Sequence, residues 1–96
     1  MVNVNRFLGL KLNALRGEQS LYEVGKATNI SRSNLKSYEE GLHLPSEEVL
    51  QRLASYYEVS YRELRILYYA DYYHRFPEER SIVLAWAEKV LQGEEL

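Results

Sequence analysis

The sequence predicts an all-α protein, and three observations lead to that prediction. No segment alternates between apolar and polar residues in the way that a half-buried strand does. Apolar residues recur instead at intervals of three and four, as Leu8, Leu12 and Leu15 do. Serines that can cap a helix stand at the head of four stretches, at Ser20, Ser31, Ser46 and Ser60. We therefore expect short helices joined by short loops.

Six helices are expected along the chain. Helical spacing gives the first four their apolar stripes, which are Leu8, Leu12 and Leu15; Val24 and Ala27; Leu35 and Tyr38; and Val49, Leu50, Leu53, Ala54 and Tyr57. A fifth helix is expected from about Tyr61 towards His74. The sixth is expected from about Pro77 to Gln92, with an apolar stripe of its own.

The composition limits the class of protein. The chain has 96 residues with no linker and no internal repeat, so residues 1–96 are expected to form one domain. It has no cysteine, which excludes disulfides, thiolate metal sites and a cysteine nucleophile. It also has no run of about 18 apolar residues. We therefore expect no signal peptide and no membrane span, and a cytoplasmic location.

Charge is distributed unevenly along the chain, whose net charge is −2. Residues 1–45 hold six basic and four acidic side chains, whereas residues 46–96 hold six basic and ten acidic ones. Nucleic acid is bound largely through basic side chains on its phosphates. Any nucleic-acid contact is therefore expected in the first half, with the second half facing solvent or protein.

The segment from Ser20 to Gly41 predicts two helices joined by a tight turn. Gly25 falls inside the first helix, where glycine costs about 0.5–1 kcal/mol relative to alanine. A close helix crossing is the simplest reason for it. Asn29 falls at the turn, and asparagine is the best non-glycine residue for a left-handed backbone. Two helices that meet steeply across a short turn form a helix-turn-helix motif.

The chain resembles the Cro-like and phage-repressor-like regulators known as the XRE family, from about Phe7 to Leu64. The positions that match the family's usual spacing are Ile30-Ser31-Arg32-Ser33, Leu35, Glu39, Gly41, Pro45-Ser46, Glu48, Leu50, Leu53-Ala54, Val59-Ser60 and Glu63-Leu64. The resemblance implies a five-helix phage-repressor-like DNA-binding domain, to which residues 65–92 add a helical extension. It also implies a sequence-specific transcriptional regulator, such as a repressor, that binds double-stranded DNA as a homodimer on a pseudo-palindromic site.

The resemblance further assigns a DNA-binding surface. The recognition helix is Arg32 to Glu40, which enters the major groove while the preceding helix crosses the DNA backbone. Arg32 can bind the O6 and N7 atoms of guanine together, and Lys36 is expected to contact phosphate. Glu39 matches a position that pairs with an arginine, here Arg16. The expected DNA-binding residues are Ser20, Tyr22, Arg32, Ser33, Asn34, Lys36, Ser37 and His43.

Three features depart from the family's pattern. The connection after Arg16, Gly17-Glu18-Gln19, is about two residues shorter than usual. Leu21 stands where many members have a glutamine that touches phosphate, so that contact is missing or is supplied by Ser20 or Tyr22. The loop at 42–44 lacks the Lys or Arg that members often carry there. We therefore expect an affinity for DNA that is either modest or dependent on dimerisation.

Tyrosine is concentrated in the second half, with seven of the nine tyrosines between Tyr56 and Tyr73. One core cannot bury them all, so they are expected partly to cover the core and partly to form a protein interface, where tyrosine is enriched. A ligand pocket lined by them is a third option. The residues expected at a homodimer interface are Tyr68, Tyr69, Tyr72, Tyr73, Ile82, Val83, Trp86 and Val90.

Other function classes are weaker alternatives. A helix-turn-helix can also serve as a protein-interaction module, such as an antitoxin-like or anti-regulator subunit, and the acidic, tyrosine-rich half would then bind a protein partner. His43 and His74 lack further ligands at metal-binding spacing, so no metal site is expected. No catalytic motif occurs, and we expect neither an enzyme nor a cofactor.

Overall fold

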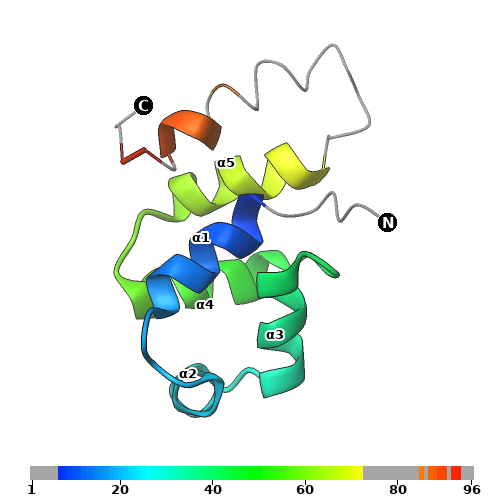
Figure 1. The fold of residues 1–96 in the computed structure, drawn as a ribbon, viewed down its shortest axis with the longest axis vertical. Helices are drawn as coiled ribbons and strands as arrows, with labels where there is room; N and C mark the ends of the chain where they lie inside the picture. The colour runs from blue at the N-terminus through cyan, green and yellow to red at the C-terminus, as the bar shows by residue number, and fades with distance from the viewer. Residues whose placement is uncertain (1–6, 73–84, 86, 91, 94–96) are drawn as a thin grey trace.

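The computed structural model describes residues 7–72, 85, 87–90 and 92–93, and these residues form helices and turns without a strand (Figure 1). The helices are α1 (Phe7–Arg16), α2 (Leu21–Thr28), α3 (Arg32–Glu40), α4 (Glu47–Tyr57) and α5 (Tyr61–Tyr72). Residues 85 and 87–90 are helical as well and fall within the expected sixth helix. The all-α prediction is confirmed.

Serine caps fix the starts of α2, α3 and α4. Each hydroxyl accepts a hydrogen bond from the backbone N–H three residues later, at distances of 3.0 Å for Ser20, 3.1 Å for Ser31 and 3.3 Å for Ser46. At Ser20 the bond is reciprocated, because the Glu23 carboxylate accepts from the Ser20 N–H at 3.2 Å. These local bonds explain why the three helices begin where the sequence predicts.

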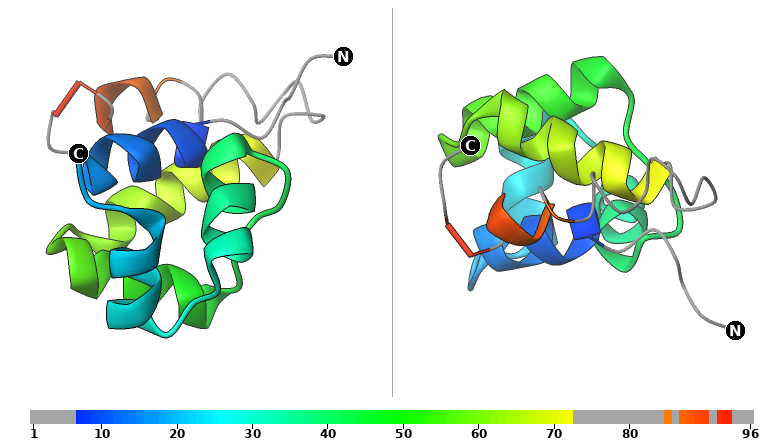
Figure 2. Two further views of the ribbon diagram at one scale, coloured as in Figure 1. Left: turned by 60° about the horizontal axis from the view of Figure 1, so that its bottom comes forward. Right: turned by 90° about the horizontal axis from the view of Figure 1, so that it is seen from above.

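The helices enclose a single apolar core. Helix α1 packs against α3 and α5, α4 packs against α5, and α2 packs against α3 and α4. Figure 2 shows the helical residues 85 and 87–90 beside α1 and α5. Their side chains Ala87 and Val90 are 0% and 1% exposed and belong to the same core cluster as Leu8, Leu53 and Leu64. Part of the expected extension therefore completes the core of the domain.

One core prediction is wrong. Ala27 is exposed, and Thr28 takes the buried position in α2, with 3% of its surface exposed. Thr28 lies four residues after the buried Val24, and its hydroxyl donates to the Val24 carbonyl at 2.7 Å. That internal bond allows a polar residue to occupy the buried position.

A buried carboxylate joins the two ends of the described core. Asp71, near the end of α5, is 0% exposed. It accepts hydrogen bonds from the backbone N–H groups of Phe7 at 2.9 Å and Leu8 at 3.0 Å. These N–H groups have no partner within α1, because they lie in its first turn. Asp71 thus caps α1 from a distant part of the chain.

Candidate nucleic-acid interface

The turn between α2 and α3 has the backbone conformation that the motif requires. Asn29 is left-handed, with φ 60° and ψ 36°, and its N–H donates to the Gly25 carbonyl. The Ile30 N–H donates to the same carbonyl at 3.2 Å. The prediction for Asn29 is confirmed.

Gly25 is required by this turn rather than by a crossing of two helices. A Cβ atom at Gly25 would lie 2.7 Å from the Ile30 carbonyl oxygen, closer than real Cβ contacts. The neighbouring side chains of Leu35 and Arg32 would be at 3.6 and 3.7 Å, which are ordinary contacts. The turn therefore folds back onto α2, and only glycine leaves room for it.

Helix α3 presents most of its polar side chains to solvent. Leu35 is buried at 3% exposure and anchors the helix, Ser37 is half-buried, and Arg32, Ser33, Asn34 and Lys36 are exposed. The core therefore holds one side of the helix and leaves its N-terminal half accessible. An accessible N-terminal half is what a helix needs to read base edges in the major groove.

An open groove runs between α2 and α3. It is lined by Arg16, Ser20, Leu21, Tyr22, Ser31, Arg32, Ser33 and Lys36. Three of these side chains are basic and none is acidic, although the chain as a whole is negative. Five of the eight predicted DNA-binding residues line this groove, so the fold brings them together.

The remaining three predicted residues lie elsewhere. Asn34 and Ser37 are on α3 but do not line the groove, and the Asn34 N–H is bonded to the Ser31 cap. His43 is exposed in the loop after α3, next to Leu42, which is 59% exposed. The groove residues Arg16, Leu21 and Ser31 are absent from the predicted set. Leu21 and Ser31 are next to predicted residues in the sequence, whereas only the fold brings Arg16 to the groove.

A partly buried ion pair holds α3 against α1. Arg16 Nε and Glu39 Oε2 are 2.8 Å apart, and the side chains are 20% and 8% exposed. A second bond joins Arg16 Nη2 to Glu39 Oε1 at 3.0 Å, so the pair is bidentate. The hydrogen bond to Glu39 raises the pKa of Arg16. The expected pairing is confirmed, and both residues support the position of α3.

The arginines near the motif differ in what they bind. Arg16 also donates to the Gln19 carbonyl at 2.7 Å. Arg52 donates to the Thr28 carbonyl at 3.2 Å, a bond that connects α4 to the end of α2. It also donates to the Glu48 carboxylate within α4 at 2.9 Å. Among the described residues, no acceptor binds the Arg32 guanidinium, which lies over the Tyr22 ring. Arg32 therefore keeps its N–H donors for an external ligand.

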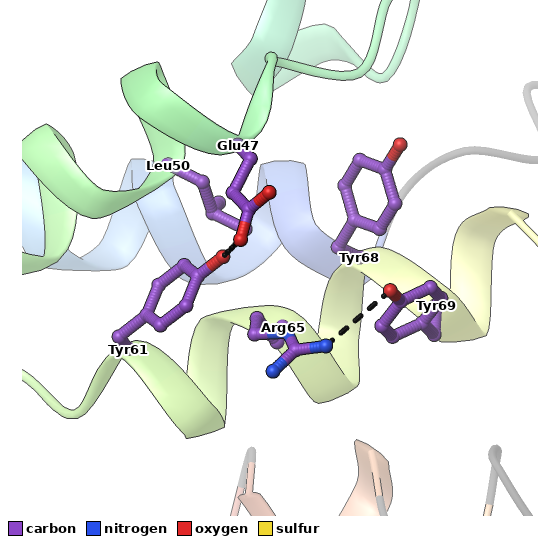
Figure 3. A pocket seen from close by; sticks show the side chains of 6 residues that line it. All are labelled: Glu47, Leu50, Tyr61, Arg65, Tyr68 and Tyr69. Carbon is purple, nitrogen blue, oxygen red and sulfur yellow. Dashed lines mark hydrogen bonds between the residues drawn. The ribbon is translucent and has the colours of Figure 1, made fainter.

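A tyrosine-rich surface lies along α5 and includes Tyr61, Tyr68, Tyr69 and Tyr72. Arg65 lies between the rings of Tyr61 and Tyr69, with its Cζ atom 5.6 Å from each ring centroid. These residues border a small pocket of about 190 Å³ with Glu47, Leu50 and Tyr68 (Figure 3). The Tyr61 hydroxyl donates to Glu47 at 3.0 Å.

The predicted dimer residues are divided between this surface, the core and segments outside the description. Tyr68 and Tyr69 are half-buried and Tyr72 is 47% exposed. Val90 lies in the core of a single chain and offers no surface to a partner. Four residues lie outside the described part of the chain, namely Tyr73, Ile82, Val83 and Trp86.

The fold and the α2–α3 face together define a helix-turn-helix domain, a fold that suggests DNA binding and is typically non-enzymatic. A family model described as "Helix-turn-helix domain" matches residues 8–67, and the chain belongs to this family. No curated protein and no solved structure gives a significant match. In the described ranges, no helix is long and apolar enough to cross a membrane, and no cluster of three or more His, Cys, Asp or Glu side chains could hold a metal ion.

Proposed function

We propose that the protein is a sequence-specific transcriptional regulator of the XRE or Cro-like class, which inserts α3 into the major groove of DNA. The observation that carries this proposal is the state of Arg32. It lies at the first position of an exposed helix, in a groove with basic and no acidic lining, and no described residue accepts from its guanidinium. An arginine in this state is suited to bidentate recognition of guanine.

Binding as a homodimer on a pseudo-palindromic site belongs to the same proposal. One helix-turn-helix reaches one half-site, and two of them about 34–36 Å apart would reach successive major grooves. The exposed parts of Tyr69 and Tyr72 form the described part of the surface that we assign to the dimer. A regulator of this kind acts on DNA inside the cell, and we place it in the cytoplasm.

The experiment that tests this function measures binding of the full chain to duplexes selected from a random pool, at increasing salt. We expect selection to enrich a sequence with two-fold symmetry. The logarithm of the affinity should fall linearly with the logarithm of salt concentration, because phosphate contacts release counterions. A chain that enriches no sequence and binds no duplex at low salt would contradict the proposal.

A protein-interaction module is the second candidate, and one observation favours it. Tyrosine and arginine are the residue types enriched at the centres of protein interfaces, and Tyr61, Arg65 and Tyr69 form such a cluster on α5. In this case the cluster would bind a different protein, and the α2–α3 face would be dispensable. The DNA-binding experiment above distinguishes the two candidates.

A further inference from the structure

We propose that Tyr22 is a positioning residue for Arg32. In this account the Tyr22 ring holds the Arg32 guanidinium over the groove, and so contributes to base discrimination without touching a base. The proposal rests on the proposed function. It adds that Tyr22 orients Arg32, the arginine proposed to contact a base.

The contact joins the two helices of the motif. The Cζ atom of Arg32 lies 5.9 Å from the centroid of the Tyr22 ring, within the range of about 6 Å for a cation–π interaction. Tyr22 is the second residue of α2 and Arg32 is the first residue of α3. Tyr22 is 58% exposed, so the contact with Arg32 lies at the surface of the groove.

The backbone on each side of the contact is fixed. Ser20 and Glu23 form a reciprocal cap around Tyr22, and the Ser31 cap comes directly before Arg32. The left-handed Asn29 sets the path between the two helices. The ring therefore occupies a defined place relative to α3, and it can limit the rotamers of a side chain that would otherwise be free in solvent.

An aromatic ring orients an arginine without occupying its donors. Arg16 and Arg52 are held by carboxylate and carbonyl oxygens, which accept their N–H groups. A ring attracts the guanidinium through its π-electron face and accepts none of these groups in a conventional hydrogen bond. Tyr22 can thus restrict Arg32 and leave its fork available for the two acceptors of guanine.

A double-mutant cycle tests the proposal with the selected duplex and a random duplex. Tyr22→Leu removes the π-electron face, and Tyr22→Phe keeps the face but removes the hydroxyl. We expect Tyr22→Leu to weaken binding to the selected duplex by about two- to fivefold, the size of an exposed cation–π contact. The loss at the random duplex should be smaller than the loss at the selected duplex, and Tyr22→Phe should keep the wild-type ratio of the two affinities.

The decisive comparison uses the Arg32→Ala background. If Tyr22 acts through Arg32, Tyr22→Leu has no further effect in that background. An equal loss in both backgrounds would overturn the proposal, because Tyr22 would then act independently. A loss in Tyr22→Phe equal to that in Tyr22→Leu would also overturn it, and would assign the hydroxyl a direct contact with phosphate.

A measurement without DNA separates this proposal from the proposed function. In the NMR spectrum of the free protein, the side-chain protons of Arg32 should be shifted upfield by the ring in wild type and Tyr22→Phe, but not in Tyr22→Leu. Identical Arg32 shifts in all three proteins would overturn the positioning role, even where the protein binds DNA. The ring-current shift together with binding to no duplex would instead overturn the proposed function, and the role of Tyr22 in base discrimination with it.

Discussion

Arg32 and Lys36 lie one turn apart on the exposed side of α3, but they are expected to contribute differently to binding. Arg32 can contact a base edge, whereas the flexible ammonium of Lys36 suits a phosphate. We expect Arg32→Ala to weaken specific binding by about 1–3 kcal/mol and to relax the preference at one base pair in each half-site. We expect Lys36→Ala to weaken binding to all duplexes and to lower the salt slope by about one.

Both predictions are checked by titrating the two variants with selected and random duplexes at several salt concentrations. Each variant is the control for the other, because both remove one positive charge from the same helix. Wild-type binding by both variants would show that α3 is not the recognition helix.

Asn29 forms the turn between α2 and α3 with a left-handed φ of 60°. This conformation predicts how substitutions at Asn29 affect the stability of the protein. Asn29→Gly is expected to be neutral or stabilising, because glycine adopts this conformation without steric cost. Asn29→Val is expected to lower the melting temperature strongly, because a β-branched residue resists positive φ. Thermal unfolding followed by circular dichroism measures both, and equal melting temperatures for the two variants would refute this account of the turn.

At the scale of elements, the sequence predicted the parts of the fold that local chemistry decides. The starts of α2, α3 and α4 were predictable because a serine cap bonds only three residues ahead. The Arg16–Glu39 pair was available only through the family resemblance, since 23 residues separate its members. The hydrogen bond from Arg52 to the Thr28 carbonyl was not predicted, because nothing near Arg52 in the sequence indicates a contact with α2.

Two further features of the fold were missed because they depend on long-range contacts. At Gly9, a Cβ atom would lie 2.7 Å from the Tyr38 carbonyl oxygen, so α1 approaches the backbone of α3 very closely. The bond from Leu8 to Asp71 spans 63 residues, and the sequence around Asp71 shows only an acid in a tyrosine-rich helix. The groove lining likewise includes Arg16, which only the packing of α1 brings to the motif.

Asp71 is expected to determine whether α1 stays attached to α5. Asp71→Ala leaves the N–H groups of Phe7 and Leu8 without this acceptor, and each unsatisfied buried donor costs about 1–3 kcal/mol. Because the Phe7 N–H is only partly buried and counts for less, we expect the free energy of unfolding to fall by about 2–4 kcal/mol. Urea unfolding measures the change, with Glu18→Ala as the control that removes an exposed acid. A change no larger than that of the control would contradict the capping role.

At the scale of the whole molecule, the position of the C-terminal residues decides how dimerisation can be tested. Removal of residues 77–96 would take Ala87 and Val90 out of the core, so a truncated chain would lose stability as well as any interface. A substitution on the exposed surface is the cleaner test. Tyr72, which is 47% exposed on α5, is the described residue best placed for it.

Tyr72→Glu is expected to weaken a two-fold dimer, because it buries a charge and sets like charges near each other across the axis. Sedimentation at micromolar concentration should show a dimer for wild type and a shift towards monomer for the variant. Leu42→Glu is the matched control, because it places the same charge on an exposed apolar residue outside this surface. A monomeric wild type, or a Tyr72→Glu variant as dimeric as the control, would refute an interface on α5.

DNA should bind the face formed by α2 and α3, and an NMR titration of the full chain with the selected duplex measures where it binds. We expect the backbone amide shifts to change most over residues 31–37 and 20–22, where the exposed side chains line or flank the groove. Amides around the pocket of Glu47, Arg65 and Tyr69 should change little. Changes confined to that pocket, or no change at saturating duplex, would show that DNA does not bind the face formed by α2 and α3.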